Sequence, residues 1–530
     1  MSEDRITLSE LARRLDVSLP VVSNWRRRHT SFPAAETGPG QDVFLVADLA
    51  AWLDDRKIAQ HARKPGEPSG TTYGARFRGP EAQRERMVLD DVHRLLDRVR
   101  EVAPVDDRTL SDFMLALLDT AERDEHAWNA VRRVSSGGIE AIEAALAHVP
   151  YPTGLRHART FLDDPRRATA LADLVAGVHH VHELGLTTRV FEDLLSDFAR
   201  RDRGWVAGML TPPAIVDLLV ELAATQTAST IFDPCCEFGE FLVAAEARRP
   251  PGSTVLYAAR ALSPHSASLA GMNLRMHGVP IEVTADASRI LRDSEALATT
   301  GRFDVVLTNP PFGLRWSNDP KSSLQGPYGS VPPTRTEFAW LQFAAASLAE
   351  DGRAGIVMPG GTLSREGSER DVRAAMVHDG IVEAIVSLPA GLFPHTNIPV
   401  TLWLLHRARQ RRQAPILLVD ARGLGVAVSR TQHTLSPEDH RRIARTVGQW
   451  RNEQDYVPEP GFSVPVPIET IRENDYVLTP ARYVGAPGVT ATASRSVREI
   501  HDDLHELTAR AADADVRADL LLERIRAWDF

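Results

Sequence analysis

An amide, two prolines and an aromatic ring follow one another from Asn309 to Phe312, directly after the apolar run FDVVLT. The two prolines end a strand, because neither can donate a backbone hydrogen bond to a neighbouring strand. The side chain of Asn309 offers a carbonyl acceptor and an NH2 donor, and the carbonyl of Pro310 is a second acceptor. The ring of Phe312 offers a flat apolar face. A Pro-Pro turn without chemistry is the simplest alternative.

These groups together suit a nucleophilic aromatic amine, such as N6 of adenine or N4 of cytosine. Two acceptors on the amine favour a pyramidal nitrogen whose lone pair is withdrawn from the ring. An amine inside a duplex is out of reach, so the base must be flipped out, and stacking on Phe312 offsets part of the unstacking cost. We therefore predict a catalytic group made of Asn309, Pro310, Pro311 and Phe312.

The elements around this group alternate between apolar strand-like runs and helical patterns over residues 205–425. Repeated alternation of this kind predicts an α/β domain with a mostly parallel sheet that is covered by helices on both faces. Ligands of such sheets bind outside the carboxyl ends of the strands. Asn309 falls at one of these ends, so the predicted fold and the predicted chemistry agree.

The first part of the chain, residues 1–56, has the pattern of a small winged helix-turn-helix. Thr7 is placed to cap a first helix, and a second helix is predicted with Val21, Val22 and Trp25 on one face. Such a second helix suits the major groove of DNA, although a packing module with a solvated arginine face is the alternative. The predicted DNA-binding side chains are Asn24, Arg26, Arg27 and Arg28.

Composition shifts divide the rest of the chain. Residues 57–83 are rich in Gly, Pro, Ser and charge, which predicts a flexible linker. Residues 84–204 carry successive helical patterns that predict an all-α domain. After the α/β domain, residues 426–530 are expected to form a connecting and helical partner-binding region.

The composition excludes several classes of protein. The net charge of -10 argues against a wholly basic nucleic-acid coat, but a local basic patch can still bind DNA. The two cysteines, Cys235 and Cys236, are adjacent and cannot build a disulfide framework or a zinc site. We predict no bound metal, no membrane-spanning segment and a cytoplasmic location.

A longer set of motifs resembles a known family. Asn-Pro-Pro-Phe after a strand is typical of amino-methyltransferases that use S-adenosylmethionine. IFDPCCEFGEFLVAA, IRENDYVLTPARYV and the stretch from TEFAWLQF to VTLWLL resemble N6-adenine DNA methyltransferases, specifically the methylation subunits of type I restriction–modification systems. The resemblance covers roughly residues 185–485. It implies S-adenosylmethionine as cofactor, double-stranded DNA as substrate, base flipping, and separate specificity and restriction subunits as possible partners.

The resemblance also assigns cofactor contacts. Thr211 and Pro212 match the segment that holds the methionine end of the cofactor. Asp233 and Gly239 match the loop where the backbone approaches the cofactor, and Asp286 matches a carboxylate near its adenine.

Two positions depart from the family pattern. Glu237 stands where a glycine is usual, so a side chain and a charge replace a permissive backbone position. Ala261 stands where an acidic residue usually binds the ribose hydroxyls. Glu240 and Ser263 are candidates to replace that missing acceptor.

These observations leave three interpretations open. The first is an active DNA adenine methyltransferase. The second is a degenerate, methyltransferase-like DNA-binding or regulatory protein with weakened cofactor binding. The third is a protein-glutamine methyltransferase, although that reaction usually has tyrosine where this chain has Phe312.

Overall fold

The structure is a computed structural model of the 530-residue chain. It describes residues 5–29, 31–37, 42–59, 62–63, 70–78, 80–102, 107–134, 165–201, 210–279, 281–287, 302–315, 317, 323–332, 335–393, 397–409, 414–429, 432–452 and 456–485. The helical patterns expected within 138–149 and 491–530 lie outside these residues. Among the described residues, no helix is both long enough and apolar enough to cross a lipid bilayer.

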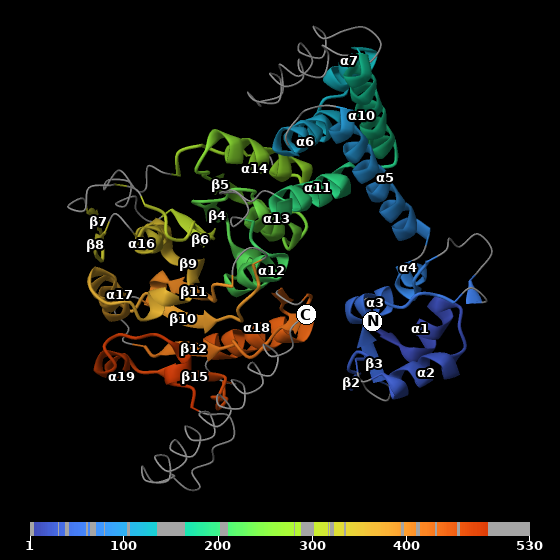
Figure 1. Ribbon diagram of the computed structural model, residues 1–530. Helices are drawn as coiled ribbons and strands as arrows, with labels where there is room; N and C mark the ends of the chain where they lie inside the picture. Colours follow the sequence, from blue (N-terminus) through green and yellow to red (C-terminus); the bar gives the residue numbers. More distant parts are fainter. Residues whose placement is uncertain are drawn as a thin grey trace, which may run out of the picture.

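The N-terminal region forms a small three-stranded sheet packed with three helices (Figure 1). Its elements are β1 (Arg5–Thr7), α1 (Leu8–Leu15), α2 (Leu19–Arg28), β2 (Glu36–Thr37), β3 (Asp42–Leu45) and α3 (Val46–Asp54). Thr7 caps α1 in a reciprocal capping box with Glu10, as its position predicts. Val22 is fully buried, but Val21 is exposed, because the burial face of α2 is narrower than the apolar pattern suggests.

The predicted linker 57–83 is partly structured, which differs from the expectation of a flexible segment. Helix α4 (Tyr73–Arg78) packs against α1 and α3, and Lys57 pairs with Thr72 in a short antiparallel bridge. The side chain of Arg76 also donates to the Leu15 carbonyl at 3.3 Å. These contacts were not visible locally, because they depend on helices that lie earlier in the chain.

A helical region joins this domain to the rest of the molecule (Figure 1). Its described helices are α5 (Pro80–Val102), α6 (Asp107–Arg123), α7 (Glu125–Val134), α10 (Pro165–Glu183) and α11 (Thr187–Arg201). One apolar cluster runs through all five helices and reaches Met272 in the following domain. Arg275 strengthens this contact by donating to the buried carboxylate of Asp119 at 2.9 Å.

The α/β region is built on an eight-stranded sheet in the order β15-β12-β10-β11-β9-β6-β4-β5. Its strands are β4 (Thr230–Asp233), β5 (Leu256–Ala259), β6 (Phe303–Thr308), β9 (Leu348–Pro359), β10 (Val382–Ser387), β11 (Val400–His406), β12 (Ile416–Asp420) and β15 (Ser463–Val466). Only β11 and β15 run against the others, so the sheet is mostly parallel, as predicted. The strand-like run at 281–287, within the alternating region, contributes a bridge between Thr284 and Arg260 rather than a full strand of this sheet.

The sheet extends beyond the predicted domain end at residue 425. Strand β15 pairs with β12 at the sheet edge and contains Pro465, which an edge strand tolerates. Because proline is uncommon within strands, this strand was not predicted from the sequence. The α/β domain therefore includes part of the region that was expected to be connecting material.

Helices cover both faces of the sheet. One face packs against α12 (Pro213–Leu222), α13 (Glu240–Ala247), α14 (Pro264–Met276) and α18 (Pro437–Arg451). The other packs against α16 (Glu337–Ser347), α17 (Ser368–Asp379) and α19 (Ile468–Glu473). Two small hairpins lie outside the sheet: β7 (Leu324–Gly326) with β8 (Gly329–Val331), and β13 (Val426–Ala427) with β14 (His433–Thr434).

Candidate active site

The predicted site residues meet at the carboxyl ends of β4, β5 and β6, three neighbouring parallel strands. Asp233 is the last residue of β4, Arg260 follows β5, and Asn309 follows β6. Because parallel strands end at the same edge, residues more than 70 positions apart in sequence become neighbours there. The α/β topology thus brings the predicted catalytic group and the predicted cofactor loop together from separate motifs.

Asn309 is held by a residue from a different segment. Its exposed fraction is 7%, and its Nδ2 donates to the hydroxyl oxygen of Thr211 at 3.1 Å. Pro310 is also buried, whereas Pro311 and Phe312 are half-buried. The donor end of the amide is therefore occupied, and its carbonyl end is left to accept a hydrogen bond. The half-buried ring of Phe312 is available for stacking.

Glu337, the first residue of α16, supports the loop that follows the catalytic group. Its carboxylate accepts the backbone N–H of Gly313 at 3.2 Å and lies 3.5 Å from the guanidinium of Arg365. Gly313 adopts a φ of 67°, which glycine adopts without strain. Glu337 was not predicted as a site residue, because Gly313, the residue that it binds, lies 24 positions away in the sequence.

The loop after β4 begins with a tight turn. The Asp233 carboxylate accepts the Cys235 N–H at 3.0 Å, which closes the start of the loop. Gly239 has a φ of 77°, and a Cβ there would lie 2.9 Å from the side chain of Leu274. Asn273 of α14 donates to the carbonyl of Phe238 at 2.8 Å. Only glycine fits position 239 without displacing α14.

Glu237 adopts a left-handed backbone conformation, which favours glycine. Its φ is 35°, in the left-handed region that costs a non-glycine residue of the order of 1 kcal/mol. Its carboxylate accepts the backbone N–H of Leu262 at 3.0 Å, directly beside the buried Ala261. The structure therefore brings a carboxylate from the loop to the strand end that lacks one. Ser263, which with Glu240 was predicted to replace the missing acid, accepts the Ser266 N–H at 3.1 Å as the N-cap of α14.

Asp286 lies at the same edge, after the bridge at Thr284. Its carboxylate accepts the Thr284 hydroxyl at 2.7 Å and lies 3.7 Å from the guanidinium of Arg260. The side chain of Asp286 is about one-third exposed, at 32%. Arg260 in turn lies over the ring of Phe232 at 5.9 Å. Asp286 is thus fixed in place but still open to a ligand.

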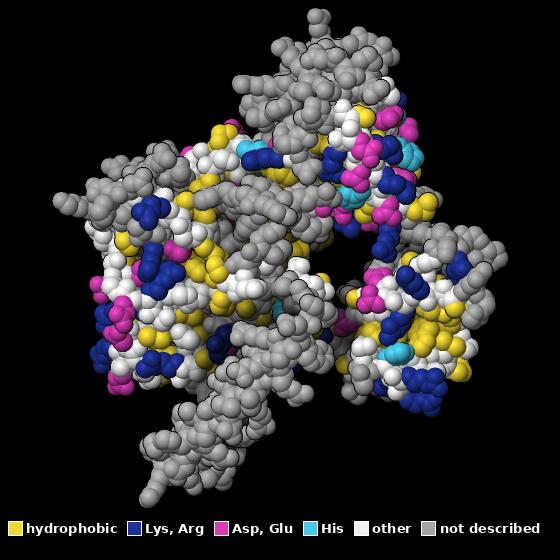
Figure 2. Space-filling model, in the orientation of Figure 1, with side chains coloured by type: hydrophobic (Ala, Val, Ile, Leu, Met, Phe, Trp, Pro, Cys, Tyr) yellow, Lys and Arg dark blue, Asp and Glu magenta, His cyan; other side chains and the backbone are white. Residues whose placement is uncertain are grey.

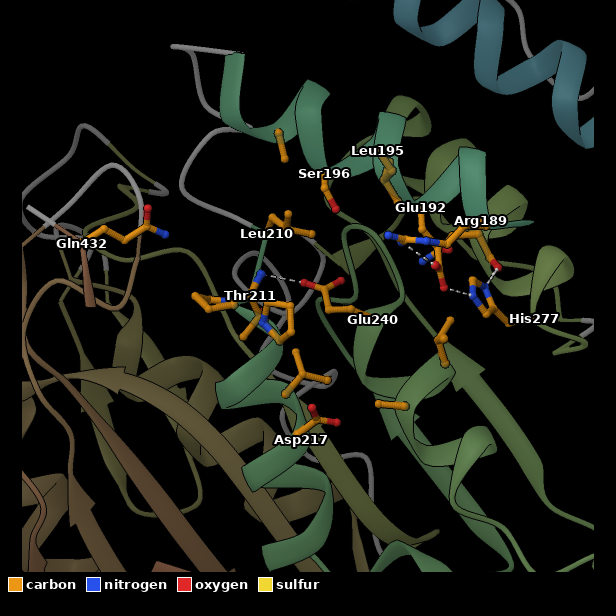
Figure 3. Close-up of a pocket in the computed structure, with 17 residues that line it drawn as sticks. Arg189, Glu192, Leu195, Ser196, Leu210, Thr211, Asp217, Glu240, His277 and Gln432 are labelled. Carbon is orange, nitrogen blue, oxygen red and sulfur yellow. Dashed lines mark hydrogen bonds and ion pairs between the residues drawn. The ribbon is translucent and has the colours of Figure 1, made fainter. Parts of the chain in front are cut away.

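Glu240 joins the site from the cavity behind it. Its carboxylate accepts the backbone N–H of Thr211 at 2.8 Å. Both residues line a cavity of about 550 Å³ between α11 and helices α12 to α14, and Figure 3 shows Glu240 pointing at Thr211. The sequence analysis considered Glu240 only as a replacement acid. The one feature of the sequence that could have indicated this role is that an acidic residue directly follows the loop glycine.

Burial sets the protonation of the acidic groups at this edge. It raises the pKa of Asp233 well above its usual value, although the hydrogen bond from the Cys235 N–H acts to lower that pKa. Burial also raises the pKa of Glu237. Burial raises the pKa of both adjacent thiols, Cys235 and Cys236, as well, so neither is a ready nucleophile. Within the described parts of the chain, no three His, Cys, Asp or Glu side chains gather as a metal site.

The predicted DNA-binding residues belong to α2 of the N-terminal domain, which lies apart from β6, the strand that precedes Asn309 (Figure 1). Arg26 pairs with Asp42 at 2.8 Å, and Arg27 donates to the Asn24 carbonyl oxygen at 3.1 Å. Arg28 is exposed. Figure 2 shows lysine and arginine side chains gathered at the lower edge of this domain. Arg26 is thus partly engaged in the fold, whereas Arg27 and Arg28 form the more accessible basic end of the helix.

Known proteins share much of this chain's sequence pattern. The sequence profile of the family described as N-6 DNA Methylase matches residues 183–491. The HindI type I restriction enzyme methylase subunit of Haemophilus influenzae is 29% identical over 315 residues, which are 58% of this chain and 70% of that protein. The MjaIX methylase subunit of Methanocaldococcus jannaschii is 29% identical over 313 residues, which are 56% of this chain and 55% of that protein.

A solved structure shares the fold. The methyltransferase subunit of a type I restriction–modification system from Streptococcus thermophilus superposes with a TM-score of 0.59 at 21% identity, over 75% of this chain and 99% of that chain. The family profile begins at residue 183, so the N-terminal domain and most of the helical region precede the matched part.

Proposed function

The chain belongs to the N-6 DNA methylase family, and on that premise we propose that it transfers a methyl group from S-adenosylmethionine to N6 of adenine in DNA. The observation that carries the proposal is the anchoring of Asn309: its NH2 group is bound to Thr211, so its carbonyl oxygen is left for the substrate amine. The reaction needs the base outside the helix, since an amine within the duplex cannot reach this buried amide.

The residues at the sheet edge fit the cofactor in kind. The sulfonium and the ammonium of S-adenosylmethionine are cationic, and the edge is rich in carboxylates, with Asp233, Glu237 and Asp286 set against Arg260. Asp286 and Glu237 are the candidates for the adenosine part, and Thr211 with Pro212 for the methionine part. Gly239 allows close backbone approach. When bound, the cofactor supplies an electrophilic methyl group.

The protein's own groups prepare the amine for that methyl group. The Asn309 carbonyl oxygen and the Pro310 carbonyl accept the two amine hydrogens and so draw the nitrogen lone pair out of conjugation. Phe312 stacks on the base and holds it outside the duplex. No ionisable base is needed to activate the amine, because the nucleophile is a neutral nitrogen.

Recognition of a DNA sequence requires further contacts. We infer that double-stranded DNA is bound partly through Arg27 and Arg28 of α2, and that specificity and restriction subunits, as in the type I enzymes, supply sequence reading and cleavage. The exposed cations of α2 suit phosphate contacts, which position a duplex without reading its sequence.

One observation favours a second candidate, a DNA-binding protein with weak cofactor affinity. Glu237 brings a buried carboxylate into a loop where a glycine is usual, and burial raises its pKa. Methylation of a protein glutamine has no such support, because the aromatic residue after the prolines is Phe312 rather than tyrosine.

Product analysis tests the proposed function. The chain is incubated with unmethylated duplex DNA and S-adenosylmethionine carrying a labelled methyl group, and the digested nucleosides are analysed by mass spectrometry. We expect labelled N6-methyl-2′-deoxyadenosine from the wild type and at least a hundredfold less from Asn309→Ala. Label in N4-methyl-2′-deoxycytidine would instead identify cytosine as the methylated base. Absence of label with the specificity subunit present, together with no measurable binding of S-adenosylmethionine, would favour the second candidate.

A further inference from the structure

Three residues from three elements form a hydrogen-bonded series that ends at the catalytic amide. The carboxylate of Glu240, at the start of α13, accepts the Thr211 N–H at 2.8 Å. The hydroxyl oxygen of Thr211, just before α12, accepts the Asn309 Nδ2–H at 3.1 Å. Thr211 is 2% exposed and Asn309 is 7% exposed, so bulk water does not replace these contacts. A charge on Glu240 therefore lies one residue away from the group that would hold the substrate amine.

We propose that Glu240 is a positioning residue that determines which end of the Asn309 amide faces the substrate amine. This inference rests on the proposed function, because orientation matters only if the amide carbonyl accepts from an amine. The two ends of an asparagine amide have nearly the same shape but opposite hydrogen-bonding character. If the NH2 end faced the amine, two donors would meet and the nitrogen lone pair would not be released.

The hydroxyl of Thr211 cannot fix this orientation alone. A hydroxyl both donates and accepts, so it can bind either end of the amide. An ionised carboxylate only accepts. The Glu240 carboxylate accepts the Thr211 N–H, and the Thr211 hydroxyl also lowers the pKa of Glu240, which is the effect of a hydroxyl that directs its proton towards the carboxylate. The hydroxyl oxygen is then left as an acceptor, and only the NH2 end of Asn309 can bind it. The carbonyl end of the amide must point the other way.

The environment of Glu240 makes this arrangement sensitive to protonation. Burial raises the pKa of Glu240 to about 7, against the N–H and the hydroxyl of Thr211, which lower it. The titratable and charged groups that face Glu240 from the surrounding elements are Asp233, Glu237, Asp217, Arg189, Glu192 and His277. Glu192 pairs with His277 at 2.8 Å and also contacts Arg189, so the cations of this set are partly neutralised. Protonated Glu240 can donate, which frees the Thr211 hydroxyl to turn towards the amide carbonyl.

The expected consequence is that the orientation of the Asn309 amide depends on pH. Above pH 7, Glu240 is ionised and Asn309 is held in the productive orientation; below pH 7 both orientations become populated. Glu240→Gln keeps an acceptor for the Thr211 N–H but adds a donor, so it is expected to mimic the protonated form at every pH.

The first test observes the free chain without cofactor or DNA. The chain is labelled with 15N-asparagine, and the side-chain NH2 signals of Asn309 are assigned by their loss in Asn309→Ala. We expect these signals to shift with a midpoint near pH 7 in the wild type and to be independent of pH in Glu240→Gln. Absence of a shift in the wild type would overturn the inference.

The second test measures methyl transfer. Single-turnover rates are measured from pH 5.5 to 9 with saturating cofactor and DNA. In Glu240→Gln we expect the rate at pH 8 to fall about tenfold, with the half-saturating concentrations of both ligands within twofold of wild type. The rise in rate near pH 7 should also disappear. Glu246→Gln on the same helix is the matched control, because Glu246 binds Arg249 and Tyr257 instead.

A double-mutant cycle distinguishes positioning from misfolding. Thr211→Val removes the hydroxyl that transmits the effect, so adding Glu240→Gln to it should cause no further loss beyond twofold. Full additivity of the two losses would overturn the inference. An inactive wild type with a titrating Asn309 signal would instead overturn the proposed function, whereas an active wild type whose rate and pH profile Glu240→Gln leaves unchanged would overturn this inference alone.

Discussion

At the residue scale, the most individual feature of the site is an acid in a glycine position. Glu237 has a φ of 35°, yet its carboxylate accepts the Leu262 N–H at 3.0 Å. The hydrogen bond offsets part of the backbone strain. It also places a carboxylate next to Ala261, at the strand end where the family pattern has an acidic residue. The glutamate at the glycine position of the loop thus occurs together with the absence of an acidic residue at the end of the neighbouring strand.

Glu237→Gln tests whether this carboxylate contributes to cofactor binding. We expect about tenfold weaker binding of S-adenosylmethionine, equivalent to about 1.4 kcal/mol, because an amide is a weaker acceptor for hydroxyl groups than a carboxylate. Calorimetric titration measures the dissociation constant, and the exposed Glu350→Gln is the control. Tighter binding in Glu237→Gln would show that the carboxylate obstructs the site.

Residue types and local spacing are enough to propose the catalytic group, because an amide, two prolines and a ring express their chemistry within four positions. They could not predict that Asn309 is anchored by Thr211 or that Glu240 acts on Thr211. Those contacts join residues 98 and 29 positions apart, and only the fold decides that they meet.

At the scale of elements, a buried ion cluster fastens α18 to the sheet. Glu383 of β10 is 2% exposed and binds Arg451 of α18 and Arg353 of β9, each at 2.6 Å. Burial opposes ionisation, but the charges and hydrogen bonds of Arg451 and Arg353 prevail and lower the pKa of Glu383 to about 2. The cluster ties the C-terminal part of the domain to strands that lie far earlier in the chain.

Glu383→Gln is expected to destabilise the protein by about 3 kcal/mol, because it leaves two partly buried guanidiniums without their counter-charge. Equilibrium denaturation in urea measures this free energy of unfolding. Glu473→Gln, on the exposed surface of α19, is the control and should change it by less than about 0.5 kcal/mol. Equal effects of the two substitutions would show that the cluster contributes nothing beyond ordinary surface charge.

The same cluster predicts how stability depends on pH. Burial and the charge of Arg353 lower the pKa of His406 to about 4, so the unfolded chain takes up this proton first as the pH falls below 6.5. Glu383 acts in the same direction: its contribution is complete above pH 4.5 and is lost as the pH falls towards 2. We expect the melting temperature to fall steadily below pH 6.5, and to fall less steeply in His406→Gln. An unchanged slope in that variant would contradict the assignment to His406.

Most strands of the sheet could be predicted from their apolar runs, because buried parallel strands carry a strong local signal. Strand β15 could not, since Pro465 is permitted only by its place at the sheet edge. Strand β9 begins directly after α16 at Leu348, within a run with a helical pattern, because pairing with β6 outweighs local preference there.

At the scale of the whole molecule, the N-terminal domain stands beside the catalytic domain and is joined to it through α4 and α5 (Figure 1). Its basic residues lie at the end of α2, while the catalytic edge lies in the sheet domain. If α2 binds DNA as we propose, the chain holds DNA at one place and acts on it at another, which increases affinity without changing the chemistry.

Arg27→Ala combined with Arg28→Ala tests this arrangement. If both side chains contact phosphates, the slope of log affinity against log salt should decrease by about 2, with weaker binding to every DNA sequence. Fluorescence anisotropy of a labelled duplex at several salt concentrations gives the slope. Arg472→Ala, an exposed arginine on α19, is the matched control. An unchanged slope in the double variant would assign α2 to contacts other than DNA.

Calorimetric titration of S-adenosylmethionine into the purified chain, with Asp286→Ala and Asn309→Ala alongside, tests the central claim most directly. We predict micromolar binding by the wild type, loss of binding in Asp286→Ala, and retained binding in Asn309→Ala, because the amide serves the substrate rather than the cofactor. Absence of binding at millimolar cofactor, from wild-type protein that is folded by circular dichroism, would contradict a working methyltransferase site in this chain.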